Sequence, residues 1–182
     1  MKKIITTAIA TAITALSFNV QAEGIAASPF TYLEYSAGNI DYDYTGADDG
    51  DYSALTGSLE LPMLIIPILS AELVDFNDAD ITKLGAGSYL QFGTGTYLYG
   101  LIHYNDYEDD DSDFSLRAGV SHRFIDNNLE VKLEHTTYTD IDFLDGTKLS
   151  VGYYFHPNFS LSGSYQVSDD YNIVALGAKL SF

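Results

Sequence analysis

The sequence predicts an all-β protein, an antiparallel up-and-down transmembrane β-barrel of ten strands, with eight strands as the alternative count. Three observations predict this class. Apolar and polar residues alternate along segment after segment, which is typical of strands with two different faces. Acidic and nearly neutral connectors also alternate along the chain. Finally, the chain begins with a pattern typical of secreted proteins.

Composition narrows the class further. The 182 residues fit one domain and carry 26 acidic groups against 8 Lys and Arg, a net charge of −18. Nucleic-acid binding needs clustered basic residues, so no nucleic-acid partner is expected. The absence of cysteine excludes disulfides, thiolate zinc sites and thiol catalysis. A hydrophobic content of 46% is more than a disordered chain carries.

Residues 1–22 have the features of a signal peptide. Lys2 and Lys3 form a positive start, 4–16 form a short apolar region, and Val20-Gln21-Ala22 is a small-residue cleavage site. The apolar region is too short for a membrane-spanning helix. We therefore expect export through this segment, followed by a barrel domain over residues 23–182.

Period-two alternation predicts the strands in order. The expected ranges are 30–42, 53–61, 68–76, 81–92, 96–107, 114–125, 129–139, 147–156, 159–168 and 171–182. The pattern is clearest in the second half, where Leu129, Val131 and Leu133 alternate with Glu130 and Lys132 among other polar residues. One face of each strand is apolar, and the other is polar or glycine.

The connectors support a count of ten. The odd-numbered connectors are acidic and the even-numbered ones nearly neutral, so that 18 of the 19 aspartates fall at one end and only Asp126 at the other. An eight-strand count would place acidic connectors at both ends. The sequence thus predicts short periplasmic turns at one end and longer, acidic extracellular loops at the other.

A membrane barrel accounts for these features better than a soluble one. Strands of about 9–11 residues, a secretion signal, and Tyr and Phe near strand ends are typical of transmembrane barrels. In that setting the apolar faces contact lipid and the polar faces line the lumen.

The last twelve residues, YNIVALGAKLSF, end on an aromatic residue with apolar residues alternating before it. This segment resembles the C-terminal signal that the bacterial outer-membrane assembly machinery reads. The residues that carry the resemblance are Val174, Leu176, Ala178, Leu180 and Phe182. By pattern over 23–182, the chain resembles small Gram-negative outer-membrane barrels of the OmpA and OmpX type, which have eight strands. The resemblance implies outer-membrane localisation, with lipid, lipopolysaccharide and the assembly machinery as partners.

Ionic residues in mid-strand form the main candidate site. They share the polar face and comprise Glu34, Glu60, Glu72, Arg117, Arg123, Glu130, Lys132, Glu134, Lys148 and Lys179. Because unpaired charge in a partly dry lumen is costly, interlocking ion pairs are the simplest expectation. The alternative is a small polar pore, helped by inward glycines such as Gly38, Gly85 and Gly119.

Acidic loops suggest weak binding of divalent ions. The densest group is Glu108, Asp109, Asp110, Asp111 and Asp113, with Asp48, Asp49 and Asp51 as a second. Residues 41–52 partly mimic a calcium loop, but Tyr52 replaces its final Glu. No cofactor is expected beyond loosely bound Ca²⁺.

Enzymatic activity is not expected. Of the four histidines, His122 and His135 are placed on the apolar face near strand ends, and no Ser–His–acid spacing matches a nucleophile motif. The expected function is a structural or surface-interaction role, with the acidic loops outside and an unknown extracellular partner. A small pore for ions or solutes is the alternative, and a lipid-modifying outer-membrane enzyme is a remote one.

Overall fold

The computed structural model describes residues 28–43, 49–61, 68–76, 79–108, 111–124, 126, 128–141 and 144–182. The predicted signal peptide therefore lies outside the described residues, as do parts of several connectors. Within the described ranges, no helix is long and apolar enough to cross a membrane.

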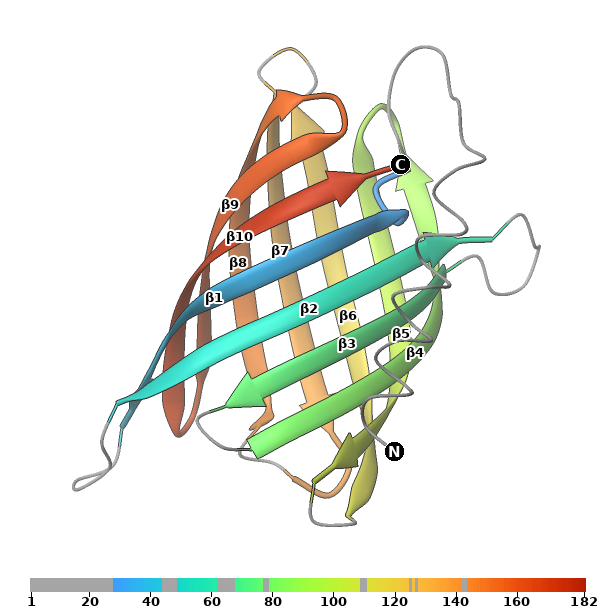
Figure 1. Ribbon diagram of the computed structural model, residues 1–182. Helices are drawn as coiled ribbons and strands as arrows, with labels where there is room; N and C mark the ends of the chain where they lie inside the picture. Colours follow the sequence, from blue (N-terminus) through green and yellow to red (C-terminus); the bar gives the residue numbers. More distant parts are fainter. Residues whose placement is uncertain are drawn as a thin grey trace.

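Ten antiparallel strands form a closed barrel (Figure 1). Their bounds are β1 Tyr32–Tyr42, β2 Gly50–Glu60, β3 Ile68–Phe76, β4 Ala79–Phe92, β5 Thr96–Tyr107, β6 Ser112–Phe124, β7 Leu129–Tyr138, β8 Gly146–His156, β9 Phe159–Ser168 and β10 Tyr171–Ser181. Each strand pairs with its neighbours in the chain, and β1 closes the barrel by pairing with β10 from Tyr32↔Ser181 to Tyr42↔Tyr171. The predicted fold class and strand count are confirmed.

The two ends of the barrel differ in charge. The β1–β2, β3–β4, β5–β6, β7–β8 and β9–β10 connectors lie at the lower end in Figure 1, which we call the acidic end. The other four connectors lie at the upper end, where the chain also finishes at Phe182, and which we call the terminal end. The segregation of aspartates that the sequence indicated is therefore a property of the folded barrel.

The predicted difference in loop length does not hold for every connector. The β9–β10 connector is only Asp169-Asp170, whereas the β2–β3 connector at the terminal end runs over 61–67. Pairing continues into the acidic end, because Gly50 and Asp51 already pair with Ile40 and Asn39 of β1. Many acidic residues therefore stand at the ends of paired strands rather than in long loops.

The outer surface of the wall is apolar. Large hydrophobic side chains such as Leu133, Val151 and Leu176 project outward, and Leu176 is 76% exposed. The exposed apolar residues occur on all strands except β2, and the outward residues of β2 are small or half-buried. A water-soluble monomer rarely exposes a continuous apolar belt of this extent, whereas a lipid-facing barrel requires one.

Candidate functional site

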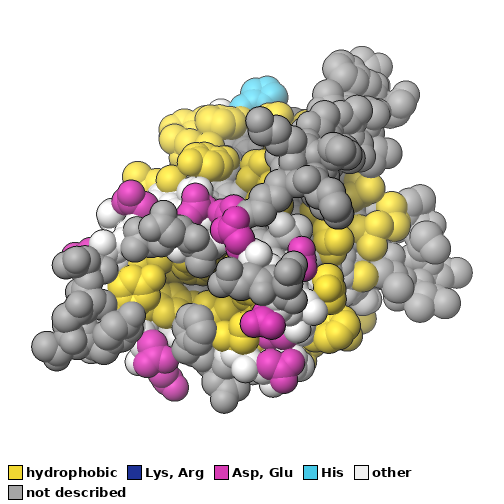
Figure 2. Space-filling model, turned by 60° about the horizontal axis from the view of Figure 1, so that its bottom comes forward, with side chains coloured by type: hydrophobic (Ala, Val, Ile, Leu, Met, Phe, Trp, Pro, Cys, Tyr) yellow, Lys and Arg dark blue, Asp and Glu magenta, His cyan; other side chains and the backbone are white. Residues whose placement is uncertain are grey.

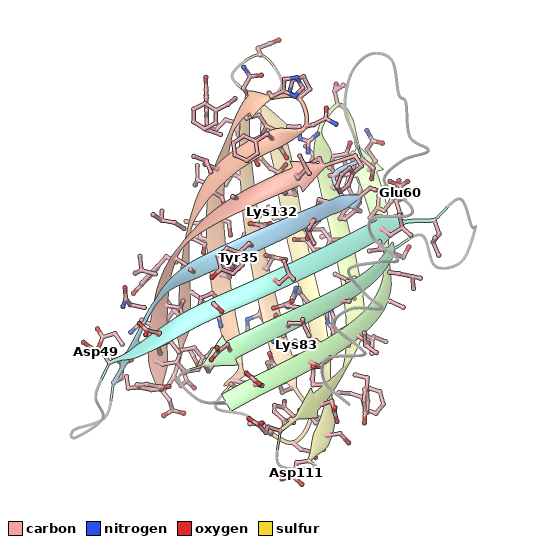
Figure 3. The ribbon with its side chains drawn as sticks, in the orientation of Figure 1. Tyr35, Asp49, Glu60, Lys83, Asp111 and Lys132 are labelled. Atoms are coloured by element: carbon pink, nitrogen blue, oxygen red, sulfur yellow. The ribbon has the colours of Figure 1, made fainter. Side chains whose placement is uncertain are left out.

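All basic side chains of the described residues line the lumen. They alternate with the outward apolar residues on their strands, and they are Lys83, Arg117, Arg123, Lys132, Lys148 and Lys179. Figure 3 shows Lys83 and Lys132 inside the barrel, and Tyr35 is labelled on β1. Lys83 is not among the predicted lumen residues, because the other face of β4 mixes polar and apolar residues, namely Thr82, Leu84 and Ala86.

One group of ion pairs is centred on Glu72 of β3. Arg117 of β6 places Nη2 2.9 Å from Glu72 Oε2, and Lys83 Nζ lies 4.0 Å from Oε1. Lys83 Nζ also donates a 2.7 Å hydrogen bond to the Tyr138 hydroxyl. Since β4 and β5 separate β3 from β6 in the wall, the Arg117–Glu72 pair links two strands that are not neighbours.

A second group is centred on Glu130 of β7. Its carboxylate lies 2.7 Å from Lys179 Nζ, 3.0 Å from Arg123 Nη2 and 3.6 Å from Lys132 Nζ. The Tyr154 hydroxyl donates a further 2.6 Å hydrogen bond to Oε2. Glu130 is 3% exposed, so this carboxylate is buried among three cations. Buried carboxylates are tolerated when they are paired and hydrogen-bonded in this way.

Three other ionic residues of the predicted set have looser surroundings. Among the described residues, no opposite charge lies within 4 Å of Lys148, Glu34 or Glu134. Glu34 accepts a 3.3 Å hydrogen bond from Ser162. Glu60 stands apart at the terminal end (Figure 3), where the hydroxyls of Tyr89 and Ser28 donate to it. Nine of the ten predicted ionic residues therefore lie inside the lumen, and Glu60 lies at its terminal end.

A cavity of about 80 Å³ remains among these groups. Five cations and four carboxylates line it, together with hydroxyls of Ser150, Ser160 and Ser162. A polar cavity of this size is large enough for several water molecules.

An apolar cluster closes the lumen at the acidic end. Its buried members are Ile40, Tyr52, Ala54, Val74, Ile81, Tyr138, Leu144, Tyr171, Ile173 and Ala175, and the half-buried Tyr42, Phe76, Tyr107 and Ile141 pack against it. We call this the aromatic cap. Leu144 and Ile141 come from the β7–β8 connector, and the Tyr171 hydroxyl donates to the Leu144 carbonyl at 3.4 Å. This connector therefore folds over the mouth of the barrel.

A smaller cluster fills part of the lumen at the terminal end. Phe30, just before β1, stacks on Tyr89 with ring centroids 4.7 Å apart and meets Tyr97 and Tyr99 edge-on. Ile68 and Leu101 complete this group, which we call the Phe30 cluster. Phe30, just before β1, therefore packs inside the second mouth of the barrel.

Gly85 and Gly119 do not widen a pore. A Cβ at Gly119 would lie 2.6 Å from the ring of Tyr99, and one at Gly85 would lie 2.3 Å from the His103 ring. Large neighbours occupy the space that these glycines leave. The prediction that inward glycines open the lumen is wrong at Gly85 and Gly119, because side chains of the adjacent strand β5 fill the space.

The proposed divalent-ion group is divided by the structure. Asp109, Asp110 and Asp48 lie outside the described residues. Asp113 points into the lumen, where the Asn105 amide and the Tyr107 hydroxyl donate to Oδ1 at 2.7 and 2.9 Å. Glu108 and Asp111 are exposed at the rim, and Asp111 and Asp49 mark that rim in Figure 3. In the described part of the chain, no three His, Asp or Glu residues come together to hold a metal ion.

The charged side chains in view at the acidic end are acidic. Figure 2 shows Asp and Glu around this end, and none of its described side chains in view is Lys or Arg. The charge on this face is therefore not neutralised by basic side chains of the wall, because those point into the lumen.

The histidines show no arrangement for catalysis among the described residues. His122 and His135 face outward and contact Thr96 Oγ1 at 2.7 Å and Thr147 Oγ1 at 3.0 Å. His103 is buried in the lumen 3.1 Å from Ser70 Oγ, and its Nδ1 has no described partner. None of these pairs is completed by a carboxylate on the second ring nitrogen.

Comparison with known proteins identifies the fold. No protein-family model matches the chain, and no curated protein matches it by sequence. Among solved structures, the KdgM porin aligns with a TM-score of 0.52 and 12% identity over 84% of this chain and 99% of its own. The same porin in complex with disordered oligogalacturonate aligns with a TM-score of 0.52 and 8% identity, with the same coverage of both chains.

An outer membrane channel from Pseudomonas putida F1 aligns with a TM-score of 0.51 and 10% identity, over 90% of this chain and all of its own. At such low identities the likeness extends to the fold alone. It does not single out the eight-stranded OmpA and OmpX type, and the ten strands seen here depart from that count. The chain has the fold of outer-membrane β-barrel proteins, as its alternating strands predicted.

Proposed function

We propose that this protein is a closed barrel of the bacterial outer membrane, with a structural or surface-interaction role carried by its acidic end. The observation that carries the proposal is that apolar clusters obstruct the lumen at both ends. The aromatic cap covers one mouth and the Phe30 cluster narrows the other. Between them, Glu72 and Glu130 hold five of the six lumen cations in ion pairs.

The direction of the barrel follows from its charge. Acidic loops suit the cell exterior, where divalent ions can bridge them to the phosphates of lipopolysaccharide. The terminal end, with Glu60 and the C-terminal strand, would then face the periplasm. This orientation supports lipid, lipopolysaccharide and the assembly machinery as the partners, and it supports export by the predicted signal peptide.

A second function, a narrow pore for small solutes, is favoured by one observation. Every Lys and Arg of the described residues faces the lumen, so a solute inside the barrel would meet all the positive charge of the wall. In such a pore the aromatic cap would have to move. A lipid-modifying activity has no comparable support.

Single-channel conductance in a planar bilayer separates the two functions. The closed barrel predicts no stable conductance steps from the wild-type protein. It also predicts that Phe30→Ala combined with Leu144→Ala admits ions, because the two truncations remove the side chains that fill the mouths. Leu133→Ala, on the lipid face, is the matched control and should stay silent. Regular steps from the wild-type protein would favour the pore instead.

A further inference from the structure

The charges around the central cavity do not balance. Four carboxylates line the cavity, and they are faced by five lining cations together with Arg123, which pairs with Glu130. Six cations against four carboxylates leave an excess of two positive charges. The remaining lumen carboxylates do not offset it, since Glu60 and Asp113 lie near opposite ends and accept hydrogen bonds from neutral donors.

Two lysines are left without hydrogen-bond acceptors. Lys132 Nζ lies 3.6 Å from Glu130 Oε1, too far for a hydrogen bond, and otherwise faces the Tyr32 ring at 5.0 Å. No acceptor among the described residues lies within bonding distance of Lys148 Nζ. Both side chains line the cavity. An ammonium group has three N–H donors, so the cavity itself must supply their partners.

A buried hydroxyl faces another part of the same cavity. Ser160 is fully buried, lines the same cavity, and its Oγ has no hydrogen-bond partner among the described residues. It stands directly beside Lys179 in the β9–β10 pairing. A hydroxyl can donate to an anion as well as to water. The same cavity therefore contains this unpartnered hydroxyl beside Lys179 as well as the two ammonium groups.

We propose that the central cavity binds one small inorganic anion, of the size of chloride, through the ammonium groups of Lys132 and Lys148. A buried excess of positive charge is costly in a low-dielectric interior, and a resident anion offsets that cost. The cavity volume of about 80 Å³ admits a monatomic anion and excludes large organic ones. The inference does not depend on whether the lumen conducts.

Thermal unfolding of the folded barrel in detergent tests this site. We expect the midpoint to rise saturably as gluconate is exchanged for chloride between about 10 and 500 mM at constant ionic strength, because ligand binding stabilises the folded state by mass action. Gluconate is the control anion, too large for the cavity. Equal midpoints in the two salts would overturn the proposal.

Two variants with opposite expectations separate binding from general destabilisation. Lys148→Gln removes a cation and Glu34→Gln removes a carboxylate from the same cavity. We expect the first to weaken the apparent chloride affinity by about tenfold and the second to strengthen it by a similar factor. Lys148→Arg should retain the chloride dependence. A shift in the same direction for Lys148→Gln and Glu34→Gln would refute the site.

Bromide provides a direct measurement on the wild-type protein, which matters if either variant fails to fold. Crystals grown with bromide in place of chloride should show an anomalous-scattering peak between Lys132 and Lys148. A cavity with only water at this position would overturn the proposal.

Discussion

Lys179 Nζ donates a 2.7 Å hydrogen bond to Glu130 Oε1 and so joins β10 to β7 across the lumen. Strands β8 and β9 separate these two strands in the wall. The bond therefore acts as a cross-brace of the barrel, and with the Arg117–Glu72 pair it links strands that share no backbone hydrogen bonds.

Glu130→Gln should strongly destabilise the barrel. Three cations would lose their common carboxylate, and breaking a buried ion pair costs about 3–5 kcal/mol. Urea unfolding of the detergent-solubilised protein measures the loss of stability. Circular dichroism is the suitable signal, because the chain has no tryptophan. Glu34→Gln is the matched control and should cost much less, because no described cation lies within 4 Å of Glu34. Similar losses for the two variants would show that Glu130 is no brace.

An arginine on the outward face should lower the free energy of unfolding strongly in mid-strand and only slightly at the rim. Leu133→Arg should cost about 2–4 kcal/mol if it enters hydrocarbon near the midplane, and the cost falls to about 0–1 near the interface. Thr139→Arg, just beyond the same strand and exposed near the acidic end, is therefore the control. Unfolding in lipid vesicles measures both. A cost that does not depend on position would contradict the membrane orientation.

Calcium should stabilise the acidic end weakly. Exposed carboxylates on neighbouring connectors repel one another, and an oxygen-seeking ion relieves that repulsion. We expect the melting midpoint in detergent to be higher in millimolar calcium than with a chelator, with an affinity of roughly 10⁻⁴–10⁻³ M.

Paired variants locate the calcium effect. Alanine at both Glu108 and Asp111 should shrink the difference between calcium and chelator. Asp113→Asn should leave it unchanged, because Asp113 is buried on the lumen face and accepts hydrogen bonds from Asn105 and Tyr107. If the chelator has no effect on the wild-type protein, the rim is simply solvated charge.

Removal of Phe182 should slow barrel assembly without affecting export. Its amide donates a hydrogen bond to the Thr31 carbonyl at 3.1 Å. This bond extends the pairing of β10 with β1 to the residue just before β1. The fraction of protein that migrates as folded barrel on unheated gels, measured over time after induction, reports insertion. Phe159→Ala removes another aromatic at the same end and should assemble normally. Normal assembly after deletion of Phe182 would contradict its role as a signal.

The alternation of residues such as Leu129 to Glu134 was enough to predict ten strands, their faces and their order. Strand periodicity is local, since successive side chains point to opposite sides whatever the rest of the chain does. The acidic connectors likewise indicated which turns share an end, because every second connector of an up-and-down barrel lies at the same end. The same pattern placed the lumen cations, except for Lys83, whose strand mixes polar and apolar residues on its outer face.

The contents of the lumen were decided only by the tertiary structure. Closure brings Glu130 beside Lys179 and Glu72 beside Arg117, pairs that no sequence spacing indicates. Closure also draws Phe30 and Leu144 into the two mouths, although both lie outside the strands. The physical reason is that periodicity specifies which way a side chain points. What it meets there depends on the register and curvature of strands far apart in the chain.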